Sequence, residues 1–132
     1  MNRYRAAIAG LLLVVATDAD AADAPPARQD IQIVMSSYSF APEMLRLQRN
    51  TTYVLHLKND ASGGHAFSSP ELFAAVMVAP EDRGKIIEGK IEVPAGQTVD
   101  IVVTPMNAGT YPVVCTHFLH QSFGMRGQAV VE

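Results

Sequence analysis

The chain has 132 residues and a formal net charge of −3, with 10 basic and 13 acidic residues spread along it. We do not expect nucleic acid as a partner, because nucleic-acid binding normally needs a clustered basic face and no basic run occurs. The chain has a single cysteine, Cys115, so it cannot form an internal disulfide.

The first 21 residues have the pattern of a secretory signal peptide. Arg3 and Arg5 form a positive start, residues 6–16 are apolar, and the Ala-Asp-Ala that ends at Ala21 offers small residues for cleavage. The apolar run is shorter than the roughly 20 residues that span a bilayer. We therefore expect export to the periplasm, cleavage after Ala21, a linker at 22–29, and no stable membrane insertion after cleavage. A cut after Ala24 and an uncleaved anchor stay open as alternatives.

Residues 30–132 are expected to form one domain, in which alternating apolar and polar residues predict strands. The expected strands cover residues 31–35, 44–47, 53–58, 86–93, 98–104, 113–114 and 128–132, and a short strand begins at His65. Residues 70–78, which begin with proline, are the expected helical turn. Seven or so short strands, with turns about every ten residues, predict an all-β fold, a small Greek-key β-sandwich.

The closing segment gathers side chains that bind soft metal ions. Cys115 lies where a strand is expected to end, His120 and Met125 lie on the following loop, and the chain returns as a strand from Gly127, so the spacing is Cys-x4-His-x4-Met. A thiolate, an imidazole and a thioether suit copper above other ions, and one more nitrogen would complete a His₂Cys site with a weak axial methionine. His65, 50 residues before Cys115, is the candidate for that nitrogen.

This pattern resembles the cupredoxins, the type 1 blue copper proteins of the plastocyanin/azurin superfamily, with a rusticyanin-like loop. The opening residues 39–60 and the closing loop both carry the likeness, which covers roughly residues 30–132. The matching positions of the closing motif are Gly109, Tyr111, Cys115, His120, Gly124, Met125 and Gly127. The resemblance implies one copper ion bound by His65, Cys115 and His120, with Met125 as axial ligand.

Two positions depart from the family pattern. Many members carry Asn or Ser directly after the first ligand histidine, where it ties the two ligand loops together. This chain has Ala66 there, so the tie must come from another residue or be missing. Many members also have proline within the cysteine-to-histidine loop, and residues 116–119 contain none.

The two remaining histidines have other expected places. His117 as the equatorial ligand would need a very tight Cys-x-His loop, so we expect it instead to lie exposed near the copper. His56 lies between Leu55 and Leu57 on an alternating strand and is expected to be a solvated surface residue.

The resemblance implies a soluble one-electron carrier and not an enzyme, because four protein ligands leave no open position for substrate. A periplasmic protein for copper tolerance or copper delivery is the alternative. The expected partners are redox proteins, such as a cytochrome or a terminal oxidase or reductase. We expect them to dock near Phe118, Leu119, His120 and Phe123 on a monomer.

Overall fold

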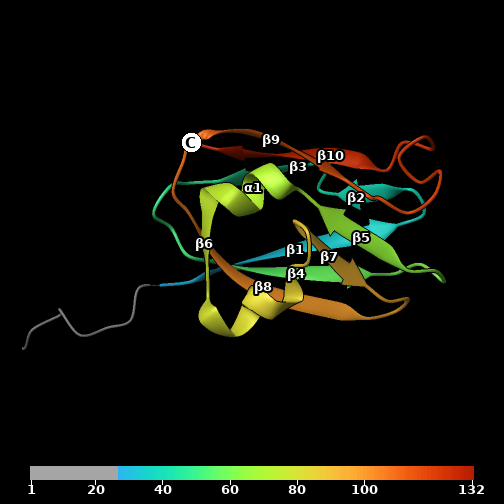
Figure 1. Ribbon diagram of the computed structural model, residues 1–132, viewed down its shortest axis with the longest axis horizontal. Helices are drawn as coiled ribbons and strands as arrows, with labels where there is room; N and C mark the ends of the chain where they lie inside the picture. The colour runs from blue at the N-terminus through green and yellow to red at the C-terminus, as the bar shows by residue number, and fades with distance from the viewer. Residues whose placement is uncertain (1–26) are drawn as a thin grey trace, which may run out of the picture.

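The computed structural model describes residues 27–132, which form two packed β-sheets of five strands each (Figure 1). The fold is therefore mostly β, as predicted, and its two layers enclose one core. The predicted signal peptide at 1–21 lies outside the described residues, as does most of the predicted linker at 22–29.

The first sheet has the strand order β2-β1-β4-β8-β6. Its strands are β1 (Gln29–Ser36), β2 (Ser39–Ala41), β4 (Tyr53–Asn59), β6 (Val76–Val78) and β8 (Thr98–Pro105). β1 and β4 run parallel, with Ile33 opposite Leu57, and the other pairs are antiparallel. Because Tyr53, Leu55 and Leu57 all face the core, the residues between them, including His56, lie on the outer face.

The second sheet has the order β3-β10-β9-β5-β7. Its strands are β3 (Met44–Leu47), β5 (His65–Ser68), β7 (Lys90–Val93), β9 (Gly109–Val114) and β10 (Arg126–Val131). β5 pairs with β7 on one side and touches β9 on the other, so the strand that begins at His65 lies between them. The loop from β9 to β10 emerges at one end of the sandwich, on the right in Figure 1.

The predicted helical turn at 70–78 is wrong in its second part. Helix α1 covers Pro70–Ala75 only, and residues 76–78 form strand β6. Val76 pairs with Pro105 and Val78 with Val103 of β8, so an open sheet edge accepts the β-branched residues that would fit poorly in a helix. A short 3₁₀ helix, η2 (Pro80–Lys85), follows and was not predicted.

The predicted strand at 86–93 is also too long, since β7 begins only at Lys90. Glu88 and Gly89 both have positive φ, 51° and 74°, which makes a tight turn and ends the extended chain there. The β-carbon of any other residue at position 89 would collide with Pro70, so the glycine permits a close approach to α1. Strand β2 was not predicted either. The strand at 44–47 appears as predicted, and the other predicted strands appear with an end shifted by one to a few residues.

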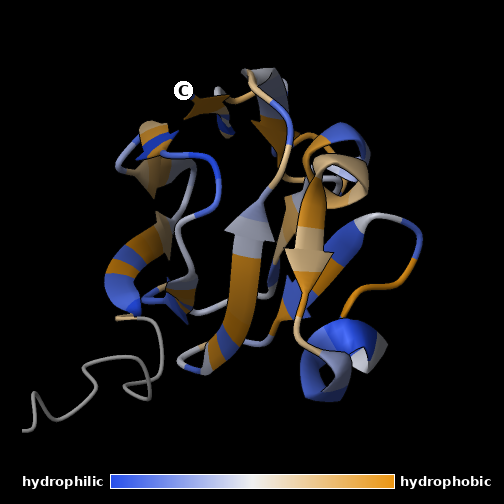
Figure 2. Ribbon diagram, turned by 90° about the vertical axis from the view of Figure 1, so that its left-hand side faces the viewer, coloured by the Kyte–Doolittle hydropathy of each residue, from blue (hydrophilic) through white to orange (hydrophobic). Residues whose placement is uncertain are grey.

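The core lies between the two sheets and draws on nearly every strand. Its largest fully buried apolar side chains are Ile33, Met35, Leu47, Leu55, Leu57, Leu72, Ile91, Ile101 and Met125. Hydrophobic and hydrophilic bands alternate along the strands in Figure 2, and η2 is predominantly hydrophilic. Within residues 27–132, no helix has the length and apolar character needed to cross a bilayer.

Candidate metal centre

The closing loop is held in shape by its own backbone. Cys115 follows the last residue of β9, and its N–H donates to the carbonyl of Met125 over 3.1 Å. The N–H of Met125 in turn donates to the carbonyl of His120 over 3.0 Å. These two bonds bring the three candidate ligands of the Cys-x4-His-x4-Met motif to one end of the sandwich, as the sequence predicts.

Tight turns carry the chain from Cys115 to His120. The N–H of His120 donates to the carbonyl of His117, and that of Phe123 donates to the carbonyl of Leu119. Leu119 has a φ of 62°, in the left-handed region that residues other than glycine rarely adopt and that costs about 1–2 kcal/mol. This turn leaves the side chains of Phe118 and Leu119 outside the core.

A buried asparagine shapes the loop that leads to His65. Asn59 ends β4 and is fully buried, and its amide donates to the carbonyls of Gly63 and Val93 over 2.9 Å each. Its side-chain oxygen accepts the N–H of Ala61. Since Val93 is also the sheet partner of His65, Asn59 places the loop and the start of β5 against β7.

The nitrogen and sulfur donors of three residues meet at one point. The Sγ of Cys115 lies 3.4 Å from Nδ1 of His120 and 3.8 Å from Nδ1 of His65, and the two Nδ1 atoms are 3.1 Å apart. A trigonal site with metal–nitrogen bonds of about 2.0 Å and metal–sulfur bonds of about 2.3 Å sets its donors roughly 3.5 to 3.8 Å apart. The distance from Cys115 to His65 falls in this range, and the two distances to His120 are slightly shorter, so small movements of the His120 ring would let all three donors bind one metal ion.

The centre is enclosed on most sides. His65, Cys115 and Met125 are fully buried, and only His120 is partly exposed. Burial, followed by the nearby charges of His120 and His117, lowers the pKa of His65 below its ordinary value. A lowered pKa keeps the imidazole neutral, which is the form that binds metal.

The turn between β1 and β2 also reaches the centre, and sequence reasoning missed it. The hydroxyl of Ser37 lies 3.4 Å from Nε2 of His65, and the rings of Tyr38 and His120 pack in a T-shaped arrangement with centroids 4.9 Å apart. No motif marks these two residues, and they lie far from either histidine in the sequence.

The sequence leads us to expect that a tie between the two ligand segments comes from a residue other than Ala66 or is missing, but the backbone of Ala66 itself provides one. The N–H of Ala66 donates to Sγ of Cys115 over 3.4 Å, a contact that needs no side chain. Hydrogen bonds to a thiolate stabilise its charge and tune the potential of a bound metal.

His117 lies beside the cluster, and the structure gives it another partner. Its Nε2 is 2.8 Å from a carboxylate oxygen of Glu92, and its side chain is 33% exposed. His56 is on the outer face of β4, as predicted, but it is not simply solvated. Its two ring nitrogens lie 2.8 Å from Asp30 and 2.6 Å from Asp100.

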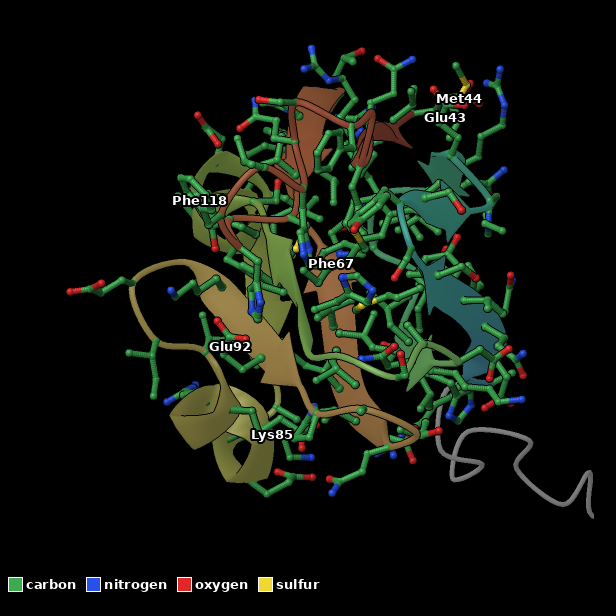
Figure 3. The ribbon with its side chains drawn as sticks, turned by 90° about the vertical axis from the view of Figure 1, so that its right-hand side faces the viewer. Glu43, Met44, Phe67, Lys85, Glu92 and Phe118 are labelled. Carbon is green, nitrogen blue, oxygen red and sulfur yellow. The ribbon has the colours of Figure 1, made fainter. Side chains whose placement is uncertain are left out.

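Apolar side chains surround the exposed edge of the centre. Phe118 is 87% exposed, Phe123 58%, Leu119 46% and Tyr38 41%. Figure 3, which looks onto this end of the sandwich, shows Phe118 projecting outwards while Phe67 lies within. The first three were predicted to surround His120 at the surface, and Tyr38 extends the same patch.

The donor set determines which ion fits. A thiolate, two imidazoles and a buried thioether, Met125, form the combination of soft and borderline donors that copper electron-transfer sites use. Oxygen donors, which calcium and magnesium require, are not part of this cluster. The four residues are thus arranged as a type 1 copper site.

Comparison with solved structures supports the fold. Auracyanin B superposes with a TM-score of 0.58 at 19% identity, over 83% of this chain and 92% of its own. Auracyanin A, a "blue" copper protein from the green thermophilic photosynthetic bacterium Chloroflexus aurantiacus, also gives 0.58 at 19% identity, over 80% of this chain and 100% of its own. At these identities the likeness concerns the fold.

A multi-copper oxidase from Pseudomonas thermotolerans also shares the fold, with a TM-score of 0.63 at 12% identity over 82% of this chain. This chain spans only 30% of that oxidase. Among curated proteins, none matches the sequence. A family model described as a cupredoxin-like domain matches residues 5–131, which is nearly the whole chain. The chain therefore belongs to the cupredoxin-like family.

Proposed function

We propose that this protein is a one-electron carrier that binds a single copper ion through His65, Cys115 and His120, with Met125 as the axial ligand. The convergence of one thiol sulfur and two Nδ1 atoms within 4.8 Å of one another carries the proposal. Bound copper would supply the Cu(II)/Cu(I) couple. The protein's own residues set the positions of the donors and keep water away from them.

The burial of the site favours electron transfer over catalysis. Because His65, Cys115 and Met125 are fully buried, a substrate would have to displace a protein ligand to reach the metal. His120 is partly exposed, so its ring is the route by which an electron leaves or enters.

The apolar surface around His120 suits brief docking of a redox protein. Phe118, Leu119 and Phe123 are exposed there, and exposed apolar patches of this kind mark interaction sites. Weak electron-transfer complexes use small interfaces. The signal-peptide pattern of residues 1–21 supports a periplasmic partner, such as a cytochrome or a terminal oxidase or reductase.

Addition of Cu(II) to the purified protein tests the metal site. We expect one copper per chain and an intense absorption band from thiolate-to-copper charge transfer, with the matching EPR signal. Cys115→Ser should abolish the band, whereas His56→Ala, which alters a histidine on the outer face, should leave it intact. A band that survives in Cys115→Ser would contradict the proposed ligand set.

Redox cycling distinguishes an electron carrier from a protein for copper tolerance or delivery. An electron carrier should be reduced and reoxidised repeatedly with one copper retained per chain. A delivery protein should instead release Cu(I) to a competing chelator after reduction. Rapid release of copper on each reduction would therefore overturn the electron-carrier role while leaving the copper site in place.

A further inference from the structure

His117 is the imidazole next to the centre that the donor set does not use. Its ring stacks on that of His120, with centroids 5.3 Å apart and planes inclined by 27°, and it lies 6.4 Å from the ring of His65. A β-carbon added at Gly64 would lie 3.4 Å from its Cε1 atom, so the ring also covers the loop before His65.

Glu92 anchors this ring to the other ligand-bearing part of the fold. The carboxylate lies 2.8 Å from Nε2 of His117 and belongs to β7, where Glu92 pairs with Ala66 of β5. Lys90, 3.6 Å from the other oxygen of Glu92, helps to orient the carboxylate. The contact thus links the loop that carries Cys115 to the paired strands β5 and β7, of which β5 begins with His65.

His120 is the donor residue whose position depends most on such contacts. It is partly exposed and lies on a loop built of turns, whereas the other three donor residues are fully buried. The rings of Tyr38 and His120 pack in a T-shaped arrangement, and the ring of His117 stacks on His120 as well. Of these two neighbours, His117 is the one whose ring nitrogen contacts a side chain of β7.

We propose that His117 and Glu92 form a clamp, two positioning residues that hold the loop of Cys115 and His120 closed against the paired strands β5 and β7. The proposal rests on the proposed function in that it takes His120 as a copper ligand. The clamp adds a link outside the donor set to the contacts that His65 and the N–H of Ala66 make with Cys115 and His120. It slows the loss of metal and limits access of small molecules to the thiol.

An ordinary surface ion pair would have different consequences. Exposed pairs stabilise a fold by up to about 1 kcal/mol and do not affect a distant site. His56 forms ion pairs of this kind with Asp30 and Asp100 on the outer face. It therefore supplies the matched control.

The first measurement uses the copper-free protein and follows the rate at which Cys115 reacts with iodoacetamide, an uncharged thiol reagent. Residues that hold metal ligands in place typically change metal affinity by about 10- to 100-fold when altered. We expect a rate increase on the order of tenfold in His117→Ala and in Glu92→Ala, and none in His56→Ala. Glu92→Gln, which keeps an acceptor oxygen, should stay near the wild-type rate.

The second measurement follows the absorption band of the Cu(II) protein during transfer of copper to excess EDTA. Both alanine variants should keep the band and lose copper about tenfold faster than wild type. His117→Phe keeps a ring on His120 but cannot bond to Glu92, so it should lose copper as fast as Glu92→Ala.

The double variant tests whether the two residues act as a unit. Glu92→Ala combined with His117→Ala should be no faster than the faster single variant, whereas multiplied rates would overturn the clamp. Single-variant rates within twofold of wild type, or an equal increase in His56→Ala, would also overturn it. If wild type forms no absorption band with Cu(II), the proposed function fails, while the iodoacetamide rates still decide the clamp.

Discussion

At the scale of single residues, substitutions of Met125 and of His120 should have different effects on the copper site. Met125→Leu keeps a buried apolar side chain and removes a weak axial donor, so copper should remain bound and the reduction potential should rise. His120→Gly removes an equatorial donor that is partly exposed, so it should leave a gap that added imidazole fills. Voltammetry and optical titration with imidazole check the two outcomes.

A reversed pattern would show that the roles are wrongly assigned. Loss of copper in Met125→Leu, together with an unaltered spectrum in His120→Gly, would place Met125 among the strong ligands and remove His120 from the site. His56→Gly serves as the control, because His56 lies on the outer face of β4.

His56 should make the stability of the protein depend on pH. Hydrogen bonds to Asp30 and then to Asp100 raise the pKa of His56 above its ordinary value of 6.5, against the opposing effect of burial. Because the folded-state pKa is the higher one, the stabilisation is fully present below the unfolded pKa and is lost as pH rises through the folded pKa. His56→Ala should therefore lower the unfolding free energy by up to about 1 kcal/mol at pH near 5.5, and by less at pH near 9.

Urea denaturation of wild type and His56→Ala at the two pH values measures this effect. A destabilisation of His56→Ala that is equal at the two pH values, or larger at the higher one, would contradict this prediction. The same experiment on Lys58→Ala provides a comparison, since Lys58 forms an exposed ion pair with Asp60 that does not involve His56.

At the scale of elements, Asp82 fastens helix η2 to strand β8. Its carboxylate accepts the N–H of Val102 over 2.8 Å and the ammonium of Lys85 over 2.6 Å, and Lys85 also donates to the carbonyl of Asp100. Burial alone would raise the pKa of Asp82, but the hydrogen bonds from Lys85 and Val102 and the charge of Lys85 outweigh it and lower the pKa. No pattern in the sequence indicates this attachment, because the carboxylate of Asp82 and its hydrogen-bond partner Val102 are 20 residues apart.

Asp82→Asn should therefore destabilise the fold in a pH-dependent way. A lowered folded-state pKa means that the stabilisation is present above the unfolded pKa of 3.8 and is lost as pH falls through the folded pKa. We expect a loss of about 1.5–3 kcal/mol near pH 7, which shrinks as the solution is acidified. Urea denaturation at several pH values measures it, with the exposed neighbour Glu81→Gln as the control. If the loss of stability in Asp82→Asn did not depend on pH, the charge of Asp82 would not be what holds η2 against β8.

At the scale of the whole molecule, copper should stabilise the fold as a unit. The donors come from two segments, β5 and the loop after β9, at least 50 residues apart, so an unfolded chain cannot present them together. A ligand that binds only the folded state raises its stability. The thermal unfolding midpoint should therefore rise on addition of Cu(II), and the rise should vanish in Cys115→Ser. An equal midpoint with and without copper in wild type would contradict this linkage.

The sequence by itself determined the class of fold and the nature of the donors. Alternation along β1, β4 and β8 predicts their buried faces, because side chains of a strand point to opposite sides. The spacing of Cys115, His120 and Met125 is local, so a single turn-rich loop is enough to bring them together. The start of a strand at His65 was likewise readable from the flanking glycines and the pattern that follows.

Only the tertiary structure decided how the site is enclosed. Ser37 and Tyr38 reach the histidines, and Glu92 reaches His117, across 25 residues or more of sequence. Such contacts depend on how β1, β7 and the closing loop lie side by side, and no periodic pattern in the chain encodes that packing. The same holds for residues 76–78, where α1 ends and β6 begins beside β8. The valines there suit a strand, but the short segment becomes one only because the open edge of the sheet pairs with it.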